Sequence, residues 1–281
     1  MSLLTNSNMI KTTRTLLFLL TLGINTTYSQ AIDTLVQVGS HRLHFTIYPG
    51  NGTPLLFESG NGEGANAWQS ILPAIHDQTG APLISYDRAG LGRSEIDTAS
   101  ISFQKELKDL KKALTQLGFG NQYFLVAHSF GGMYASEFSN QNNITGAVFI
   151  DVSTPCNLDN EYANRVKNSI SDENWRMLKQ YRAGLYYVLK NFPEIADYMS
   201  ERYLSNEIPL TLIVASNYTA NPQIGESEND MQEWKTCLKE FGRLPKHSYV
   251  STENTDHKVW LKDPDTVIKE ITQLYLKVSE E

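Results

Sequence analysis

Residues 124–133 read Phe124-Leu125-Val126-Ala127-His128-Ser129-Phe130-Gly131-Gly132-Met133. An apolar strand pattern ends at a serine with small residues two positions to either side, and a helical pattern starts directly after it. A strand-to-helix turn this sharp leaves little room for side chains beside the serine, and it lifts the hydroxyl clear of the sheet. Alanine stands at position 127, where glycine is more usual, and it still satisfies the need for small size. The segment therefore predicts a nucleophilic serine, Ser129, at the end of a buried strand.

Short apolar runs alternate with amphipathic helical patterns along the rest of the chain. This alternation predicts an α/β fold, in which helices cover both faces of a mostly parallel, eight-stranded sheet. The first two expected strands, 34–38 and 42–48, form an antiparallel pair. The six further expected strands span residues 54–59, 82–87, 122–129, 146–152, 210–215 and 247–251. Ser129 thus follows the third parallel strand.

Two helices begin at residues that favour helix starts. Ser102 precedes a helix with leucines spaced three or four residues apart, and Asp263-Pro264 opens a closing helix with an apolar face. Residues 155–206 are rich in tryptophan, tyrosine and phenylalanine, and they contain no strand pattern. We expect them to form a helical cap, inserted over the carboxyl edge of the sheet within one domain of residues 30–281.

The N-terminus resembles an export signal. Lys11 and Arg14 precede the apolar run 16–24, which is too short for a membrane-spanning helix, and small residues follow it. We predict a signal peptide over residues 1–29, cleaved after Ser29, and a secreted or periplasmic protein with no stable membrane insertion. An uncleaved anchor or a buried first helix is the alternative.

Charge and cysteine content exclude several classes of protein. The chain has 281 residues with 24 basic and 31 acidic side chains, a formal charge of −7, so we expect no nucleic-acid partner. Two cysteines are too few for a zinc ribbon or an iron–sulfur cluster, and no metal or other cofactor is expected. Cys156 and Cys237 either pair in an oxidising compartment or are buried separately.

Three further segments, together with the Ser129 turn, resemble the α/β-hydrolase family over nearly the whole chain after residue 33. Residues 86–94 (Tyr-Asp-Arg-Ala-Gly-Leu-Gly-Arg-Ser) resemble the family's turn after the strand preceding the nucleophile. Residues 58–62 (Glu-Ser-Gly-Asn-Gly) resemble its oxyanion loop, with Ser59 where histidine is frequent. Residues 256–258 (Asp-His-Lys) resemble its catalytic-histidine loop. We interpret Asp87 and Arg88 as a structural charged pair at the turn.

A serine hydroxyl needs a base within hydrogen-bond reach, because it is a weak nucleophile at neutral pH. His257 is the best candidate, since it follows the last strand in a loop that overhangs the serine in this fold. His128 is expected to pack on the opposite face of its strand from Ser129. The resemblance implies that the backbone N–H groups of Phe130 and Asn61 stabilise the oxyanion.

The acid that orients the histidine is open between two places. The family's usual position, after the strand 210–215, is followed by residues 216–221, which contain no carboxylate. The family's alternative position is the strand end at Asp151, and we favour it because a strand terminus fixes a side chain better than a long loop. The competing candidates lie further along the chain and are Glu226, Glu228 and Asp230.

These features predict a serine hydrolase that cleaves an ester-like, amide or thioester bond in a small molecule through an acyl-enzyme. The serine argues against epoxide hydrolase and haloalkane dehalogenase chemistry, in which this fold resembles attack by a carboxylate. Two alternatives remain, a non-catalytic binding protein with the same pocket and a cofactor-free haloperoxidase-like activity. Bond type, natural substrate and oligomeric state are left open by the sequence.

Overall fold

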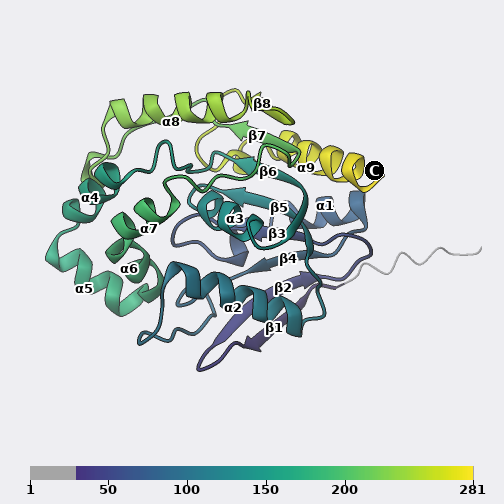
Figure 1. Ribbon diagram of the computed structural model, residues 1–281, viewed down its shortest axis with the longest axis horizontal. Coiled ribbons are helices and arrows are strands. Elements are labelled where there is room, and N and C mark those ends of the chain that lie inside the picture. The colour runs from purple at the N-terminus through teal and green to yellow at the C-terminus, as the bar shows by residue number, and fades with distance from the viewer. Residues whose placement is uncertain (1–29, 281) are drawn as a thin grey trace, which may run out of the picture.

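The computed structural model describes residues 30–280, so the predicted signal peptide, residues 1–29, lies outside the described residues. One sheet runs through the molecule in the strand order β1-β2-β4-β3-β5-β6-β7-β8 (Figure 1). β1 pairs with β2 and β2 with β4 in antiparallel register, and all other neighbours are parallel. The predicted mostly parallel, eight-stranded sheet is confirmed. The strands are β1 (Ile32–Gln37), β2 (Arg42–Tyr48), β3 (Leu55–Glu58), β4 (Leu83–Tyr86), β5 (Gln122–His128), β6 (Asn143–Ile150), β7 (Leu210–Val214) and β8 (His247–Ser251).

Two of the helices that cover the sheet, α2 and α9, begin at residues whose side chains cap them. The Ser102 hydroxyl accepts a hydrogen bond from the Lys105 N–H at 3.2 Å at the start of α2, and Asp263 caps α9 through the Thr266 N–H at 3.1 Å. Both satisfy an N–H group that the first helical turn leaves free. The helices outside the cap region are η1 (Ala65–Trp68), α1 (Leu72–Thr79), α2 (Phe103–Gln116), α3 (Gly131–Ser139), η2 (Pro222–Ile224), α8 (Glu228–Phe241), η3 (Val259–Leu261) and α9 (Pro264–Ser279).

The sheet is covered on both faces, and each face has its own core. Leu110 of α2, Met133 of α3 and Leu238 of α8 are buried in the core of one face. Ile75 of α1 and Ile271 of α9 are buried in the core of the other. Burying a large apolar side chain contributes about 1.5–3 kcal/mol. The central strands β3, β4 and β7 are fully buried and mostly apolar, whereas the edge strands β1 and β8 are largely exposed.

Four helices and no strand follow β6 before the chain returns to the sheet at β7. They lie together beside the sheet, at the left of Figure 1. The region predicted as a cap, residues 155–206, is therefore helical. Its helices are α4 (Asn160–Ser169), α5 (Asp172–Tyr181), α6 (Ala183–Lys190) and α7 (Phe192–Met199).

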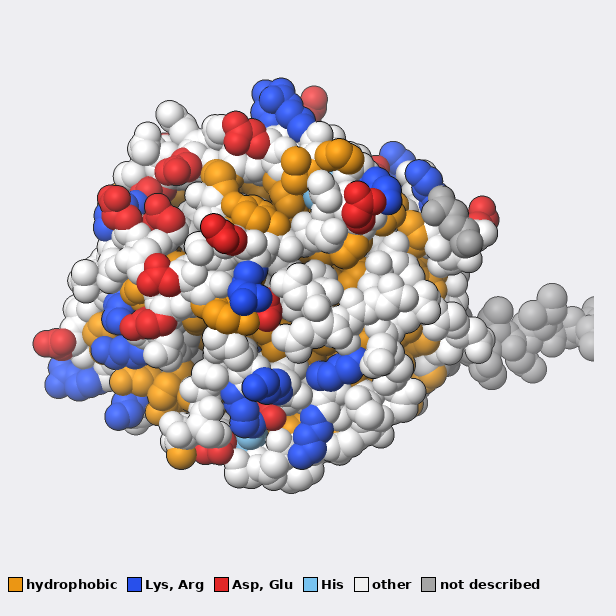
Figure 2. Space-filling model, viewed as in Figure 1, with side chains coloured by type: hydrophobic (Ala, Val, Ile, Leu, Met, Phe, Trp, Pro, Cys, Tyr) orange, Lys and Arg blue, Asp and Glu red, His pale blue; other side chains and the backbone are white. Residues whose placement is uncertain are grey.

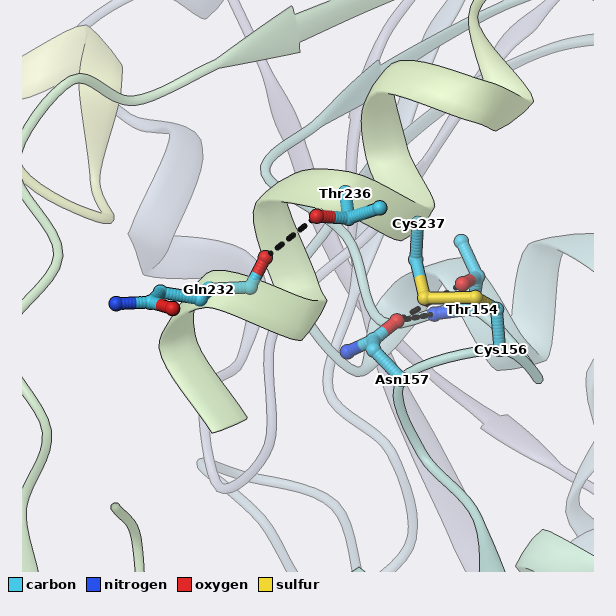
Figure 3. Close-up of a disulfide and its surroundings, with 6 residues drawn as sticks. All are labelled: Thr154, Cys156, Asn157, Gln232, Thr236 and Cys237. Carbon is cyan, nitrogen blue, oxygen red and sulfur yellow. Dashed lines mark hydrogen bonds between the residues drawn. A yellow bond between two sulfur atoms is a disulfide. The ribbon is translucent and has the colours of Figure 1, made fainter. Parts of the chain in front are cut away.

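A disulfide joins Cys156 to Cys237, with 5.8 Å between their Cα atoms. Cys156 lies in the segment that leads from β6 into the cap, and Cys237 lies on α8 (Figure 3). Beside it the Asn157 side-chain oxygen accepts hydrogen bonds from the N–H and the hydroxyl of Thr154. Of the two fates left open for the cysteines, the structure shows pairing, which ties the base of the cap to α8.

The surface carries no single-sign patch on the face shown in Figure 2, where acidic and basic side chains are interspersed. Within residues 30–280, no helix has the length and apolar character needed to cross a membrane.

Candidate active site

Ser129 stands on a strained turn between β5 and α3. Its φ angle is 53°, in the left-handed region that non-glycine residues rarely adopt. The turn is held by hydrogen bonds from the Ser129 N–H to the Ile150 carbonyl at 3.2 Å, and from the Ser153 N–H to the Ser129 carbonyl at 2.9 Å. A Cβ atom at Gly131 would lie 2.4 Å from the Glu58 carbonyl oxygen, so only glycine fits there. The predicted strand–serine–helix turn is thus present, with its small residues required by close packing.

Asp151 and His257 meet at the carboxyl edge of the sheet. Asp151 follows β6, is fully buried, and accepts a hydrogen bond from His257 Nδ1 to Oδ2 at 2.7 Å. Its other oxygen, Oδ1, accepts from the Ala215 N–H at 3.2 Å and from the Tyr218 hydroxyl. Because a carboxylate oxygen only accepts, Nδ1 of His257 is the donor in this hydrogen bond, which leaves Nε2 of His257 as the acceptor.

Ser129 and His257 line the same cavity, which has a volume of about 430 Å³. Within residues 30–280 no hydrogen bond joins the Ser129 hydroxyl to the His257 ring, whose Nδ1 is engaged by Asp151. In ligand-free enzymes such contacts are often long and tighten only when a substrate is bound. The geometry therefore places an oriented imidazole and the hydroxyl of the half-buried Ser129 in the lining of one cavity.

Two residues of the cavity lining have backbone N–H groups without a partner among residues 30–280. The amides of Phe130 and Asn61 donate no hydrogen bond to any residue of the described range, and both residues line the cavity. Phe130 is the residue before α3, so its N–H is one of the free donors of a helix start. These amides are the pair expected to hold an oxyanion.

Arg88 fixes the loop that carries Asn61. Its guanidinium donates to the Ser59 carbonyl at 2.7 Å and to the Gly60 carbonyl at 2.5 Å, and it lies 3.7 Å from Glu58. Asp87, in contrast, binds the Ala65 N–H and His44. The interpretation of Asp87 and Arg88 as a pair with each other is wrong, because the two side chains leave the turn in different directions and find different partners.

His128 does more than pack. Its Nε2 atom lies 3.0 Å from the His257 carbonyl oxygen, and Nδ1 lies 3.4 Å from a carboxylate oxygen of Glu63, which also pairs with Lys258. Burial lowers the pKa of His128 although Glu63 opposes this, so the ring is neutral at physiological pH. The contacts of His128 with Glu63 and with the His257 carbonyl thus join the loop after β3 to the loop that carries His257.

The three competing carboxylates are not at His257. Glu226 accepts from the Tyr162 hydroxyl, and Asp230 forms a capping box with Ser227 at the start of α8. Glu228 is exposed in the first turn of that helix. Of the four candidate acids, Asp151 is the one that contacts the imidazole.

The cavity wall is mainly apolar and comes from the cap, the loop after β7 and α8. Among residues 30–280 no group of histidine, cysteine, aspartate or glutamate side chains is arranged to hold a metal ion. The wall residues from these three segments include Leu158, Tyr162, Val166, Leu189, Phe192, Tyr218, Met231 and Trp234.

A protein-family model described as the alpha/beta hydrolase fold matches residues 53–243. The chain belongs to the α/β-hydrolase fold family. The uncharacterized protein YqjL of Bacillus subtilis is 30% identical over 105 residues, which cover 36% of this chain and 40% of that relative. The match thus spans about two fifths of the relative's length.

Solved structures with this α/β-hydrolase fold differ in chemistry. A thermophilic esterase from Thermogutta terrifontis superposes with a TM-score of 0.58 at 17% identity, covering 89% of this chain and 99% of that chain. The haloalkane dehalogenase DbeA-M1 loop variant from Bradyrhizobium elkanii gives 0.67 at 15% identity, covering 89% and 97%. At such identities the likeness shows the fold alone, and the reaction has to be argued from the site.

Sequence reasoning missed three residues around this α/β-hydrolase site. Tyr218 binds Asp151, Arg88 holds the oxyanion loop, and His128 supports the histidine loop. Each contact joins segments far apart in the chain, and no local pattern marks it. Among the local sequence patterns, the small residues flanking Ser129 are the strongest indication of the site.

Proposed function

We propose that this chain is a serine hydrolase that cleaves an ester-like bond of a small molecule. Ser129 is the nucleophile, His257 the general base and acid, and Asp151 the residue that orients the imidazole. The amides of Phe130 and Asn61 are the oxyanion donors. The observation that carries the proposal is the Asp151–His257 hydrogen bond of 2.7 Å at the cavity that Ser129 also lines.

The reaction has two halves. His257 Nε2 takes the Ser129 proton as Oγ bonds to the carbonyl carbon, and the bond to the alcohol breaks as that proton passes to the leaving oxygen. Water then attacks the acyl-enzyme, giving its proton to His257, which returns it to Ser129 as the carboxylic acid leaves. In each half the negative oxygen lies at the two amides, where the loss of one donor costs about 2.7–4 kcal/mol.

An apolar cavity with a few convergent polar groups is typical of a site for a small organic molecule. The wall residues favour a substrate with an apolar or aromatic portion. A serine on the turn, in place of a carboxylate, favours acyl transfer over the alkyl transfer expected of dehalogenase chemistry.

Export from the cytoplasm is part of the proposal. The pattern of residues 1–29 predicts it, and the Cys156–Cys237 disulfide supports it because such bonds persist mainly in oxidising compartments. Expression of the full chain, followed by N-terminal sequencing of the mature product, tests this point. We expect the mature protein to begin at Gln30, and a cytoplasmic product that retains Met1 would contradict it.

Covalent labelling tests the chemistry. A fluorophosphonate probe should label the wild-type protein on Ser129, while Ser129→Ala should remain unlabelled although it folds normally. A protein that fails to react while a control serine hydrolase reacts would instead be a binder with the same fold. Hydrolysis of p-nitrophenyl esters and aminoacyl anilides would then establish the bond type.

A further inference from the structure

One carboxylate, that of Glu226, lines the cavity that holds Ser129 and His257. Within the described part of the chain, the lining contains no lysine or arginine, and its remaining side chains are apolar, aromatic or neutral polar apart from His257. Glu226 is half-buried, and a charged group that loses part of its hydration without an oppositely charged partner is destabilised. A carboxylate in such a wall therefore calls for an explanation.

Two donors fix the direction of this carboxylate. The Tyr162 hydroxyl donates to Oε1 at 2.9 Å, and the Asn221 N–H donates to Oε2 at 3.0 Å. Burial, followed by the charge of Glu226, raises the pKa of Tyr162, so its phenol is a proton donor over the whole neutral range. An ionised carboxylate has about four acceptor sites, and these two contacts leave the others free.

No cation of the described chain neutralises Glu226. Two basic residues lie on the neighbouring helix α4: Arg165 pairs with Glu161 at 3.0 Å and with Asp230, and Lys167 lies 3.9 Å from Glu194. All of those acids lie outside the residues that line the catalytic cavity. The wall thus presents a fixed negative charge that the described protein leaves unpaired.

We propose that the substrate carries a protonated amino group that binds Glu226 while its ester-like carbonyl lies at Ser129. This inference rests on the proposed function and names its substrate class. The ring of Trp234, an aromatic group of the kind that attracts a cation, lines the same cavity. A methyl group of similar size would displace water from the carboxylate without replacing its hydrogen bonds, and such mismatches give strong discrimination.

Direct binding tests the amine site without requiring turnover. Isothermal titration calorimetry compares n-hexylammonium chloride with n-hexanol on the wild-type protein, and we expect the ammonium ion to bind about tenfold to a hundredfold more tightly. Glu226→Gln should abolish this preference. Glu228→Gln is the matched control, because it removes the same charge from an exposed position outside the cavity, and it should keep the preference.

Turnover separates this inference from the proposed function. The p-nitrophenyl ester of ε-aminohexanoic acid is compared with p-nitrophenyl heptanoate, in which a methyl group replaces the ammonium group. We expect kcat/KM to favour the amino ester at least about tenfold in the wild type, and this ratio to fall toward one in Glu226→Gln.

Each outcome has one meaning. Hydrolysis of both esters at equal rates, with equal binding of amine and alcohol, would overturn the amine site and leave Glu226 as an anchor of residues 221–226. Amine preference without hydrolysis of either ester would contradict the proposed function and keep the site. If Glu226→Gln fails to fold, the wild-type comparison of ammonium with hydroxyl still decides.

Discussion

Substitution of Asp151 gives the most direct test of the proposed role of this residue as the acid that orients His257. In Asp151→Asn the amide can offer its N–H₂ group to His257 Nδ1, which selects the wrong tautomer and removes the charge that stabilises the imidazolium. We expect turnover of a neutral p-nitrophenyl ester to fall at least ~100-fold, because the corresponding change in a serine protease costs about 10⁴-fold. Stopped-flow or steady-state kinetics measures the loss.

The competing acids supply the controls for that measurement. Glu228→Gln and Asp230→Asn should each hydrolyse the same neutral ester within about threefold of the wild type, since neither contacts the histidine. Near-native turnover in a folded Asp151→Asn protein would move the orienting role to one of these carboxylates.

In the proposed mechanism, Tyr218 acts on the reaction through Asp151. Its hydroxyl donates to Asp151 Oδ1, while its ring lines the cavity, so Tyr218→Phe removes the donor and keeps the wall. A hydrogen bond to a charged group contributes about 1.5–3 kcal/mol, and we expect kcat to fall about tenfold or more with KM nearly unchanged. A rise in KM at constant kcat would show instead that the hydroxyl serves only substrate binding.

The loop after β3 is the element on which the oxyanion site depends. Arg88 binds two carbonyl groups of this loop and lies beside the buried Glu58, so Arg88→Met removes the contacts and leaves a carboxyl group without its cation. Above about pH 7, where Glu58 is ionised, breaking this buried ion pair costs about 3–5 kcal/mol. We expect a lower free energy of unfolding in urea and a loss of activity of about tenfold to a hundredfold.

A second substitution separates stability from positioning. In Arg88→Met with Glu58→Gln, the carboxyl group that lies 3.7 Å from the lost guanidinium is replaced by a neutral amide, so part of the stability should return while the loop contacts stay absent and the activity stays low. A double variant that hydrolyses esters like the wild type would show that Arg88 contributes to stability without positioning Asn61.

The disulfide joins the base of the cap to α8, and both elements supply walls of the cavity. A crosslink between residues this far apart in sequence restricts the unfolded chain strongly, and its removal typically costs about 2–5 kcal/mol. We expect Cys156→Ser with Cys237→Ser to lower the urea midpoint accordingly and to raise KM more than it lowers kcat. The wild-type protein in dithiothreitol should behave in the same way, and an unchanged midpoint in the double variant would contradict this role.

At the scale of the whole molecule, the sequence predicts the layers well and the long-range contacts poorly. Apolar runs mark strands because both faces of a parallel strand are buried, and Ser129 is marked by the small residues its turn requires. The sequence favours Asp151 as the acid that orients His257 because it stands at a strand end. The Arg88–Glu58 contact and the disulfide join distant segments, and the spacing of apolar residues along the chain does not predict them. The prediction that Asp87 and Arg88 pair with each other is wrong, since adjacency in sequence does not bring side chains together.

Buried carboxyl groups give the molecule a pH dependence that the active site alone would not. Burial raises the pKa of Glu58 to about 7 despite the opposing charge of Arg88, and burial likewise raises the pKa of Glu106 to about 7. For Glu63, the effect of burial is outweighed by His128 and Lys258, and the pKa is lowered to about 2. Between pH 4.5 and about 7, Glu58 and Glu106 are therefore protonated in the folded protein and ionised in the unfolded chain. Between about pH 2 and 4.5, Glu63 is ionised in the folded protein and protonated in the unfolded chain.

These shifts predict a maximum of stability on the acid side of neutrality. Stability from Glu58 and Glu106 is full below pH 4.5 and is lost as the pH rises to about 7, because the folded state binds more protons than the unfolded state in this interval. Each group contributes on the order of 3 kcal/mol, at about 1.4 kcal/mol per pKa unit. Stability from Glu63 has the opposite sign and is lost as the pH falls from 4.5 to about 2. Urea unfolding across this range should show the decline above pH 5, and Glu58→Gln with Glu106→Gln should flatten it, while the exposed change Glu228→Gln should leave it intact. The same slope in the double variant would mean that these two carboxyl groups are not its source.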